Sequence, residues 1–153
     1  MSLNLRFGKI FDKNGRYKST RMVEFLKAAY TLTANDSNKI FMLDLATGFT
    51  VTLPQIAIVP LGFEIEFIVK TAPASGTYVV TENTRYDTNI IVTNGINELE
   101  VDTGNDGPSN TGHTTITFAD GVAIKGDRIK IMSDLTNWYC TGQTKAVSGI
   151  TLA

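Results

Sequence analysis

The feature that most limits the fold is an alternation of apolar and polar residues with a period of two. It is clearest where Phe63, Ile65 and Phe67 alternate with Glu64 and Glu66. Successive side chains of a β-strand point to opposite faces of a sheet, so this pattern is typical of a strand with one buried face. The segment therefore predicts a strand that packs on a hydrophobic core.

Eight other segments carry the same period or a run of β-branched and aromatic residues. With the segment above, the predicted strands are 39–45, 49–53, 63–70, 77–81, 89–93, 98–102, 115–118, 128–131 and 138–141. Turn residues separate them, notably Gly48, Asp120-Gly121 and Gly126-Asp127. Segments 39–45 and 49–53 predict a hairpin, residues 104–112 predict a loop, and the tail 147–153 predicts an edge strand. Strands at this spacing favour a sandwich or barrel.

The predicted fold is all-β, an antiparallel β-sandwich or jelly-roll-like barrel formed by residues 31–153, with an extended N-terminal arm at residues 1–30. The segment 21–30 is ambiguous. Met22, Phe25, Leu26 and Ala29 fit a helical stripe, whereas the alternation around Phe25 also fits a strand. We expect one or two helical turns or an extended linker there.

Charge is distributed unevenly, although the chain of 153 residues has a net charge of only −1. Residues 1–30 hold seven of the 14 basic side chains and two of the 15 acidic ones, which gives +5; the remainder carries −6. Apolar side chains are interleaved with the basic ones. A basic segment on an acidic body is typical of a partner-binding arm. The arm residues expected to bind a partner are Leu5, Arg6, Phe7, Lys9, Ile10, Phe11, Lys13, Arg16, Tyr17, Lys18 and Arg21.

Candidate catalytic and metal-binding residues are few. His113 is the only histidine and Cys140 the only cysteine, whereas a zinc site needs three or four such ligands. The segment 102–107 lacks the spacing and the distal glutamate of a calcium loop. No serine lies in a nucleophile motif, and the i, i+2 carboxylates at residues 98–102 are typical of a solvated strand face. We expect no catalytic, cofactor or metal site, and we expect Cys140 to be a small buried residue.

Part of the chain resembles a known module. The segments TLTANDSNKIFMLDLATGFTVTLPQI from Thr31, LGFEIEFIV from Leu61, and ITFADGVAIKGDRIKIMSDLTNWYCTGQ from Ile116 carry the resemblance. Together with GTYVVTE they resemble a β-sandwich module of tailed-bacteriophage structural proteins, among them capsid decoration (cement) proteins. The similar stretch covers roughly residues 31–143. The module has no catalytic residues to carry over.

The resemblance implies a virion protein on the outer capsid surface, made in the host cytoplasm, that binds the major capsid protein between capsomers and associates with itself as a homotrimer. A tail-fibre, spike or head-fibre module for host attachment or fibre docking is the alternative. An enzyme, such as a glycan depolymerase, is disfavoured because a chain with one histidine offers few groups for acid–base chemistry.

Two other classes of partner are disfavoured by the sequence. The longest apolar runs fall far short of the roughly 20 residues that cross a bilayer, so we expect no membrane association. The first 18 residues also lack the apolar centre of a signal peptide. The basic arm, with its aromatic residues, could contact nucleic acid, but the acidic body works against a broad nucleic-acid surface.

Overall fold

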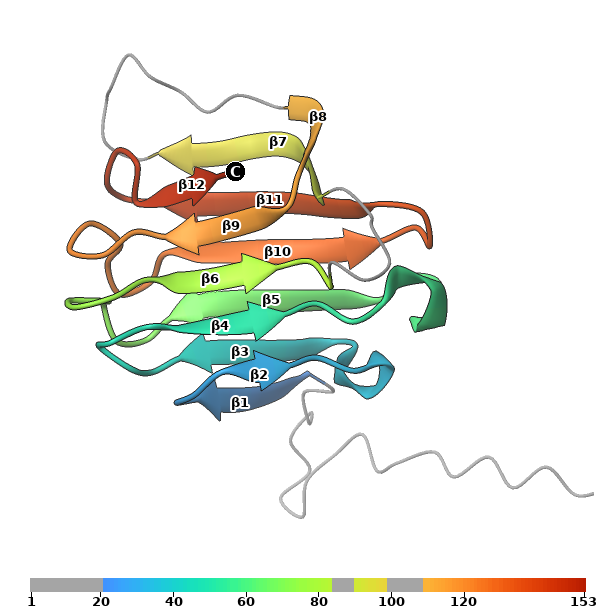
Figure 1. Ribbon diagram of the computed structural model, residues 1–153, viewed down its shortest axis with the longest axis horizontal. Coiled ribbons are helices and arrows are strands. Elements are labelled where there is room, and N and C mark those ends of the chain that lie inside the picture. Colours follow the sequence, from blue (N-terminus) through green and yellow to red (C-terminus); the bar gives the residue numbers. More distant parts are fainter. Residues whose placement is uncertain (1–20, 84–89, 99–108) are drawn as a thin grey trace, which may run out of the picture.

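The computed structural model describes residues 21–83, 90–98 and 109–153; of these, 90–98 and 109–112 are described by their backbone alone. Strands from these residues form two stacked sheets, a β-sandwich (Figure 1). The large sheet contains, in spatial order, β1 (Met22–Leu26), β3 (Lys39–Leu43), β5 (Glu64–Val69), β10 (Arg128–Ser133), β11 (Trp138–Thr144), β7 (Ile90–Glu98) and β8 (Ser109–His113). The small sheet contains β12 (Ile150–Leu152), β9 (Thr115–Phe118), β6 (Tyr78–Thr81), β4 (Phe49–Thr52) and β2 (Tyr30–Thr31).

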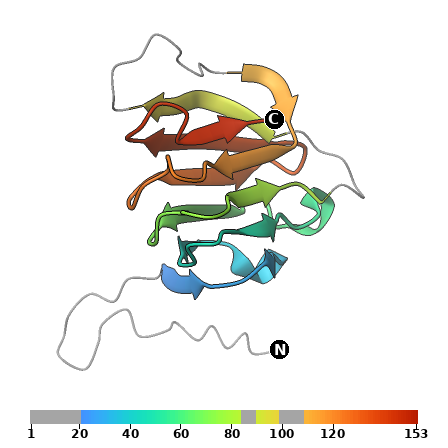
Figure 2. The same cartoon turned by 60° about the vertical axis from the view of Figure 1, so that its left-hand side comes forward.

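The first six strands wind as a coil through the two sheets. Each odd-numbered strand joins the large sheet and each even-numbered strand the small one. Within each sheet these strands are therefore parallel: β1 pairs with β3, β3 with β5, β2 with β4 and β4 with β6. Figure 2 shows β1, in blue, at one end of the stack and β8, in orange, at the other, next to β7 in yellow. Two 3-10 turns, η1 (Ala34–Asp36) and η2 (Ile56–Ile58), lie in connections of this coil.

The C-terminal strands extend both sheets mainly with antiparallel pairs. β10 lies between β5 and β11 and is antiparallel to both, and β9 lies between β6 and β12 in the same manner. β11 pairs in parallel with β7, with a bulge between Cys140 and Gly142. Both sheets are thus mixed, and their first halves differ from the antiparallel arrangement expected from the sequence.

The core lies between the sheets. Phe41, Phe63, Ile65 and Phe67 are fully buried, as the alternation predicted. Trp138 packs edge-on against Phe63, with ring centroids 5.7 Å apart. Fully burying a large apolar side chain contributes about 1.5–3 kcal/mol, so these buried side chains are a main source of the stability of the sandwich.

The predicted turn at Gly126-Asp127 is confirmed and brings its own hydrogen bonds. At the β9–β10 turn, Gly126 has a φ of +101°, a left-handed conformation that favours glycine. The buried carboxylate of Asp127 accepts hydrogen bonds from the backbone N–H of Ile124 and Lys145 and from the hydroxyl of Thr144. This carboxylate therefore ties the turn to the end of β11.

The structure confirms the all-β sandwich and the edge strand in the tail, which is β12. The expected hairpin is wrong, because Gly48 carries the chain from β3 in one sheet to β4 in the other. The expectation of helix or linker at 21–30 is also wrong: residues 22–26 form β1, so the sandwich begins before residue 31. Ser109–His113, in part expected to be loop, forms β8. Of the predicted strand 98–102, only Glu98 lies within the described residues.

Candidate binding surface

The outer face of the large sheet carries apolar side chains next to its β1 edge. The inward residues of β1, β3 and β5 alternate with outward ones, and the register places Phe25 beside Met42 and Met42 beside Ile68. We call the apolar residues of the outward set the apolar strip; they are Val23, Phe25, Ile40, Met42 and Ile68. Val23 and Phe25 are each 54% exposed. Contiguous apolar side chains on a sheet face are typical of a contact surface.

The same edge is also the end of the sheet as far as the described residues go. Among them, β1 is the outermost strand of the large sheet and pairs only with β3. An edge strand presents N–H and C=O groups that another chain can pair with, and natural proteins commonly protect such edges with charge or cover. Met22, 65% exposed, adds a third large apolar side chain to β1. The β1 edge therefore has the features of a strand that is covered by a partner.

Charged side chains border the apolar strip. Arg21 Nη1 lies 2.9 Å from Glu66 Oε2, and Arg21 Nη2 lies 3.9 Å from Glu64. Lys130 on β10 lies 2.8 Å from Glu64. Arg21 is the one predicted arm residue within the described part of the chain, and these ion pairs hold it over β5. The other ten, Leu5, Arg6, Phe7, Lys9, Ile10, Phe11, Lys13, Arg16, Tyr17 and Lys18, lie outside the described residues.

A second charged group lies at the other end of β1. The Lys70 ammonium lies 2.6 Å from Asp44 and 4.8 Å from the centre of the Phe25 ring. The hydrogen bond from Lys70, with a further one from Thr71, holds the pKa of Asp44 below its usual value. Lys27 also approaches Asp44, at 3.7 Å. Phe25 is thus held beside a cation while much of its ring remains exposed.

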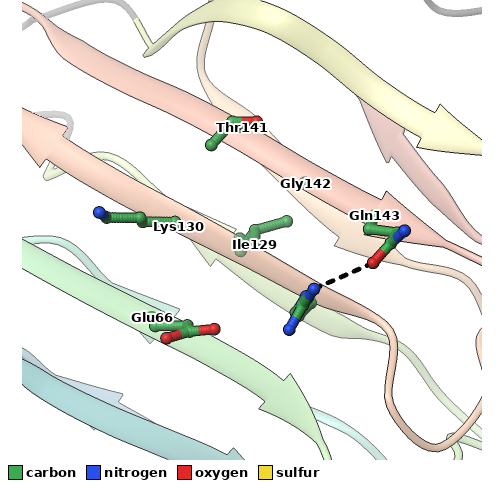
Figure 3. Close-up of a pocket in the computed structure, with 7 residues that line it drawn as sticks. Glu66, Ile129, Lys130, Thr141, Gly142 and Gln143 are labelled. Atoms are coloured by element: carbon green, nitrogen blue, oxygen red, sulfur yellow. Dashed lines mark hydrogen bonds between the residues drawn. The ribbon is translucent and has the colours of Figure 1, made fainter.

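A shallow hollow of about 380 Å³ lies farther along this outer face (Figure 3). Its rim consists of outward side chains from β5, β10 and β11, and its floor is the backbone at Ile129 and Gly142, which are paired. The rim residues are Glu66, Arg128, Lys130, Thr141 and Gln143. Arg128 donates a hydrogen bond to Gln143 across the two strands, at 3.1 Å. Amide, hydroxyl and charged groups thus converge on an open depression.

Among the charged side chains described above on the outer face, the basic ones outnumber the acidic ones. The charged side chains named on it are five basic ones (Arg21, Lys27, Lys70, Arg128, Lys130) and three acidic ones (Asp44, Glu64, Glu66). The segment that precedes Arg21 in the sequence is also basic. The chemistry of this face therefore suits a partner that is apolar at its centre and acidic around it.

A buried ionic cluster supports the β1 edge from beneath. The Asp36 carboxylate, 2% exposed, contacts the Lys39 ammonium at 2.6 Å and accepts hydrogen bonds from the backbone N–H and hydroxyl of Thr33. Lys39 also reaches Glu24 of β1 at 3.0 Å. Burial opposes the charge on Asp36, but the hydrogen bonds from Lys39 and Thr33 outweigh it and lower its pKa. The bond to Asp36 raises the pKa of Lys39.

The other described side chains that could act as nucleophiles or metal ligands do not form a site. Cys140 is fully buried, as expected, and burial raises the pKa of its thiol to about 12. His113, at the end of β8, is half-buried. Within residues 21–83, 90–98 and 109–153, no three His, Cys, Asp or Glu side chains lie close enough to hold a metal ion. The same residues contain no helix long and apolar enough to cross a bilayer.

Sequence reasoning missed the apolar strip. Val23 and Phe25 were visible as an alternation, but this signal competed with a helical stripe in the same ten residues. Ile40 and Met42 lie between inward-facing residues, and only the pairing of β1 with β3 brings the two pairs together.

Comparison with protein-family models, with curated proteins and with solved structures gave no match. The surface must therefore be interpreted from its own chemistry.

Proposed function

We propose that this chain is a virion structural protein that acts by adhesion: a capsid decoration protein that binds the major capsid protein between capsomers and stabilises the shell. It performs no reaction in this role, and its copies associate as a homotrimer on the outer capsid surface. The resemblance of residues 31–143 to phage β-sandwich modules supports the class of protein. The contact chemistry of the large sheet supports the mode of action.

The β1 edge carries the proposal. It combines a strand at the edge of the described sheet, the exposed side chains of Val23 and Phe25, and a basic segment that joins it at Arg21. Ordering a chain segment costs about 1–2 kcal/mol per residue, so an adhesive arm must bury apolar groups on its partner. The residues of the apolar strip are already held in strands, so burying them on a partner costs little further conformational entropy. The basic side chains around the strip favour a partner with an acidic surface.

The test is reconstitution on shells that lack the protein. Purified chain is added, and the occupancy of the particles is measured by sedimentation and gel densitometry. A Val23→Ser/Phe25→Ser variant is expected to bind at least tenfold more weakly, and deletion of residues 1–20 is expected to weaken binding further. Higher salt is expected to reduce the charge-dependent share of binding.

The matched control is Ile58→Ser/Leu61→Ser. These two side chains are 59% and 76% exposed, as apolar as Val23 and Phe25, but lie in the β4–β5 connection away from the strip. The control is expected to bind like the original chain. The proposed contact would be contradicted if both double variants bound equally weakly. It would also be contradicted if a chain that lacks residues 1–20 and carries Val23→Ser/Phe25→Ser still occupied the shells fully.

The hollow gives a specific reason to keep a fibre, spike or head-fibre module as the second candidate. Its rim of Glu66, Arg128, Lys130, Thr141 and Gln143 offers the hydrogen-bonding groups that a sugar of a host glycan would need. Copy number separates the two functions: hundreds of copies per particle favour decoration, whereas small multiples of three favour a fibre. Turnover of a host polysaccharide by the purified chain would contradict both.

A further inference from the structure

The hollow on the outer face of the large sheet continues into a second one at the β9–β10 turn. The second hollow has a volume of about 270 Å³ and is bordered by this turn and by the end of β11. Gln143 lines both hollows, so the two adjoin, and we call them together the basic groove. The charged residues that line the basic groove are Glu66, Lys125, Asp127, Arg128, Lys130 and Lys145.

The two acidic residues of the basic groove already have partners within the chain. Glu66 lies 2.9 Å from Arg21 in an ion pair. The carboxylate of Asp127 is buried and accepts hydrogen bonds from two backbone N–H groups and one hydroxyl. The negative charge of the groove is therefore largely balanced before any partner binds.

The basic residues of the groove are balanced less completely. Lys130 lies 2.8 Å from Glu64. Arg128 donates a hydrogen bond to the amide oxygen of Gln143, which carries no charge. Among the side chains that the structure describes, neither Arg128 nor Lys125 has a carboxylate partner, and both are exposed. The groove therefore presents positive charge to a partner.

We propose that the basic groove receives an extended acidic segment of the same protein partner that covers the apolar strip. The inference rests on the proposed function for the shell as that partner, and it adds the chemistry of the segment. Ile68 of the apolar strip is the register neighbour of Arg128, so the strip and the groove adjoin on one face. A partner that is apolar over the strip and acidic over the groove is complementary to both.

The spacing of the cations suits a strand-like segment. Arg128 and Lys130 are two positions apart on β10 and both point outward, which places them about 6.6 Å apart along the strand. Acidic side chains at alternate positions of an extended segment have the same spacing. The Arg128 guanidinium can bind a carboxylate through two hydrogen bonds. The Lys130 ammonium has three N–H donors, so its pair with Glu64 leaves donors for a second carboxylate.

Two observations favour a protein segment over a glycan in the groove. None of the described residues that line it is aromatic, so they offer no ring for a sugar to stack on. The groove also adjoins the apolar strip, where Val23 and Phe25 expose side chains that an apolar partner surface would bury. A hydroxyl-rich glycan would leave that part of the contact unfilled.

The test is fluorescence anisotropy of the full chain with a short labelled peptide in which glutamate alternates with threonine. We expect saturable binding at low salt that weakens as salt is raised. Lys125→Gln/Arg128→Gln is expected to bind about tenfold more weakly, because two exposed ion pairs together contribute roughly that factor. Circular dichroism and urea unfolding check that the variant is folded.

Lys27→Gln is the matched control, since Lys27 is an exposed cation of the same face, 70% exposed, beside Asp44 rather than the groove. It is expected to bind the peptide like the original chain. A peptide with glutamine in place of glutamate is expected not to bind. The inference would be overturned if the acidic peptide did not bind, or if Lys27→Gln weakened its binding equally. Tighter binding of an oligogalacturonate with the same number of carboxylates would also overturn it, and would support the fibre or spike module instead.

Shell reconstitution separates this inference from the contact at the β1 edge. Lys125→Gln/Arg128→Gln is expected to lower the occupancy of shells. If it does so while Val23→Ser/Phe25→Ser keeps full occupancy, the contact at the β1 edge fails and the groove remains. If the peptide binds but the groove variant occupies shells like the original chain, the shell does not supply the segment: the inference is overturned and the contact at the β1 edge stands.

Discussion

Arg21 and Glu66 are joined by an ion pair of 2.9 Å that reaches from the start of β1 across β3 to β5. The two residues are 45 positions apart in the sequence. The pair fixes the point at which the basic segment meets the sandwich, on the outer face of the large sheet and beside the apolar strip. It therefore sets the direction from which the arm starts.

The first prediction separates this orienting role from stability. Arg21→Gln is expected to lower the free energy of unfolding by about 1 kcal/mol or less, because a partly exposed ion pair contributes little. Its binding to shells is expected to weaken more than that loss explains, since the arm is no longer held at β5. Urea unfolding and shell occupancy measure the two effects. Lys27→Gln, which removes a charge elsewhere on the same face, is the control; equal loss of occupancy in both variants would assign the effect to charge alone.

The second prediction concerns the buried cluster beneath β1. Asp36→Ala leaves Lys39 with Glu24 as its remaining acidic partner and removes the acceptor for Thr33. Breaking a buried ion pair costs roughly 3 kcal/mol. We expect a loss of that size in urea unfolding at pH 7. Asp120→Ala, at an exposed turn, is expected to change the unfolding free energy by less than about 0.5 kcal/mol.

The same cluster gives a pH dependence with a definite sign. In the folded state, the hydrogen bonds from Lys39 and Thr33 hold the pKa of Asp36 below its ordinary value. Its contribution is therefore fully present above the unfolded-state pKa, and is lost as the pH falls through the folded-state value. Stability measured from pH 5 down to pH 2 is expected to fall more steeply in the original chain than in Asp36→Ala. Parallel curves for the two proteins would show that Asp36 contributes nothing to acid sensitivity.

The outcome of the sequence analysis has a physical explanation. Alternation identified the inward residues of β5, because the side-chain period of a strand depends only on its own backbone. It could not distinguish parallel from antiparallel neighbours, which share that period, and so the coil of β1–β6 was missed. The contact between Arg21 and Glu66 depends on β3 lying between β1 and β5, and no local signal contains that information.

The two candidate surfaces were visible in the sequence to different degrees. Arg128 and Lys130 can be recognised as an outward pair from the alternation alone. Their union with Lys125 and Gln143 into one groove requires the pairing of β10 with β11 and the path of the β9–β10 turn, which only the structure supplies. The apolar strip likewise depends on the pairing of β1 with β3.

The fourth prediction uses the buried thiol. Burial raises the pKa of Cys140 to about 12, so almost none of the thiol is ionised near pH 8. Cys140 is also fully buried, so a reagent cannot reach its sulfur in the folded protein. Folded protein is expected to react with a disulfide-exchange reagent only at the rate of unfolding, and fully in denaturant. The release of coloured thiol measures both rates. Rapid labelling of the folded chain would show that the space between β11 and the small sheet opens.

The last prediction compares two glycines that share a backbone conformation but differ in surroundings. Gly48 and Gly62 have φ values of +66° and +78°, so an alanine at either is strained. At Gly48 the added Cβ would also collide with the backbone carbonyl of Thr77, because the β3–β4 turn stacks directly on the β5–β6 connection; at Gly62 it would meet nothing within 4 Å. Gly62→Ala is expected to cost about 1 kcal/mol, the conformational share alone. Gly48→Ala is expected to cost at least about 2 kcal/mol more, since backbone must move in two successive turns of the coil. Urea unfolding of the two variants measures the difference, and equal losses would mean that the stacked turns do not stabilise the winding of β1–β6.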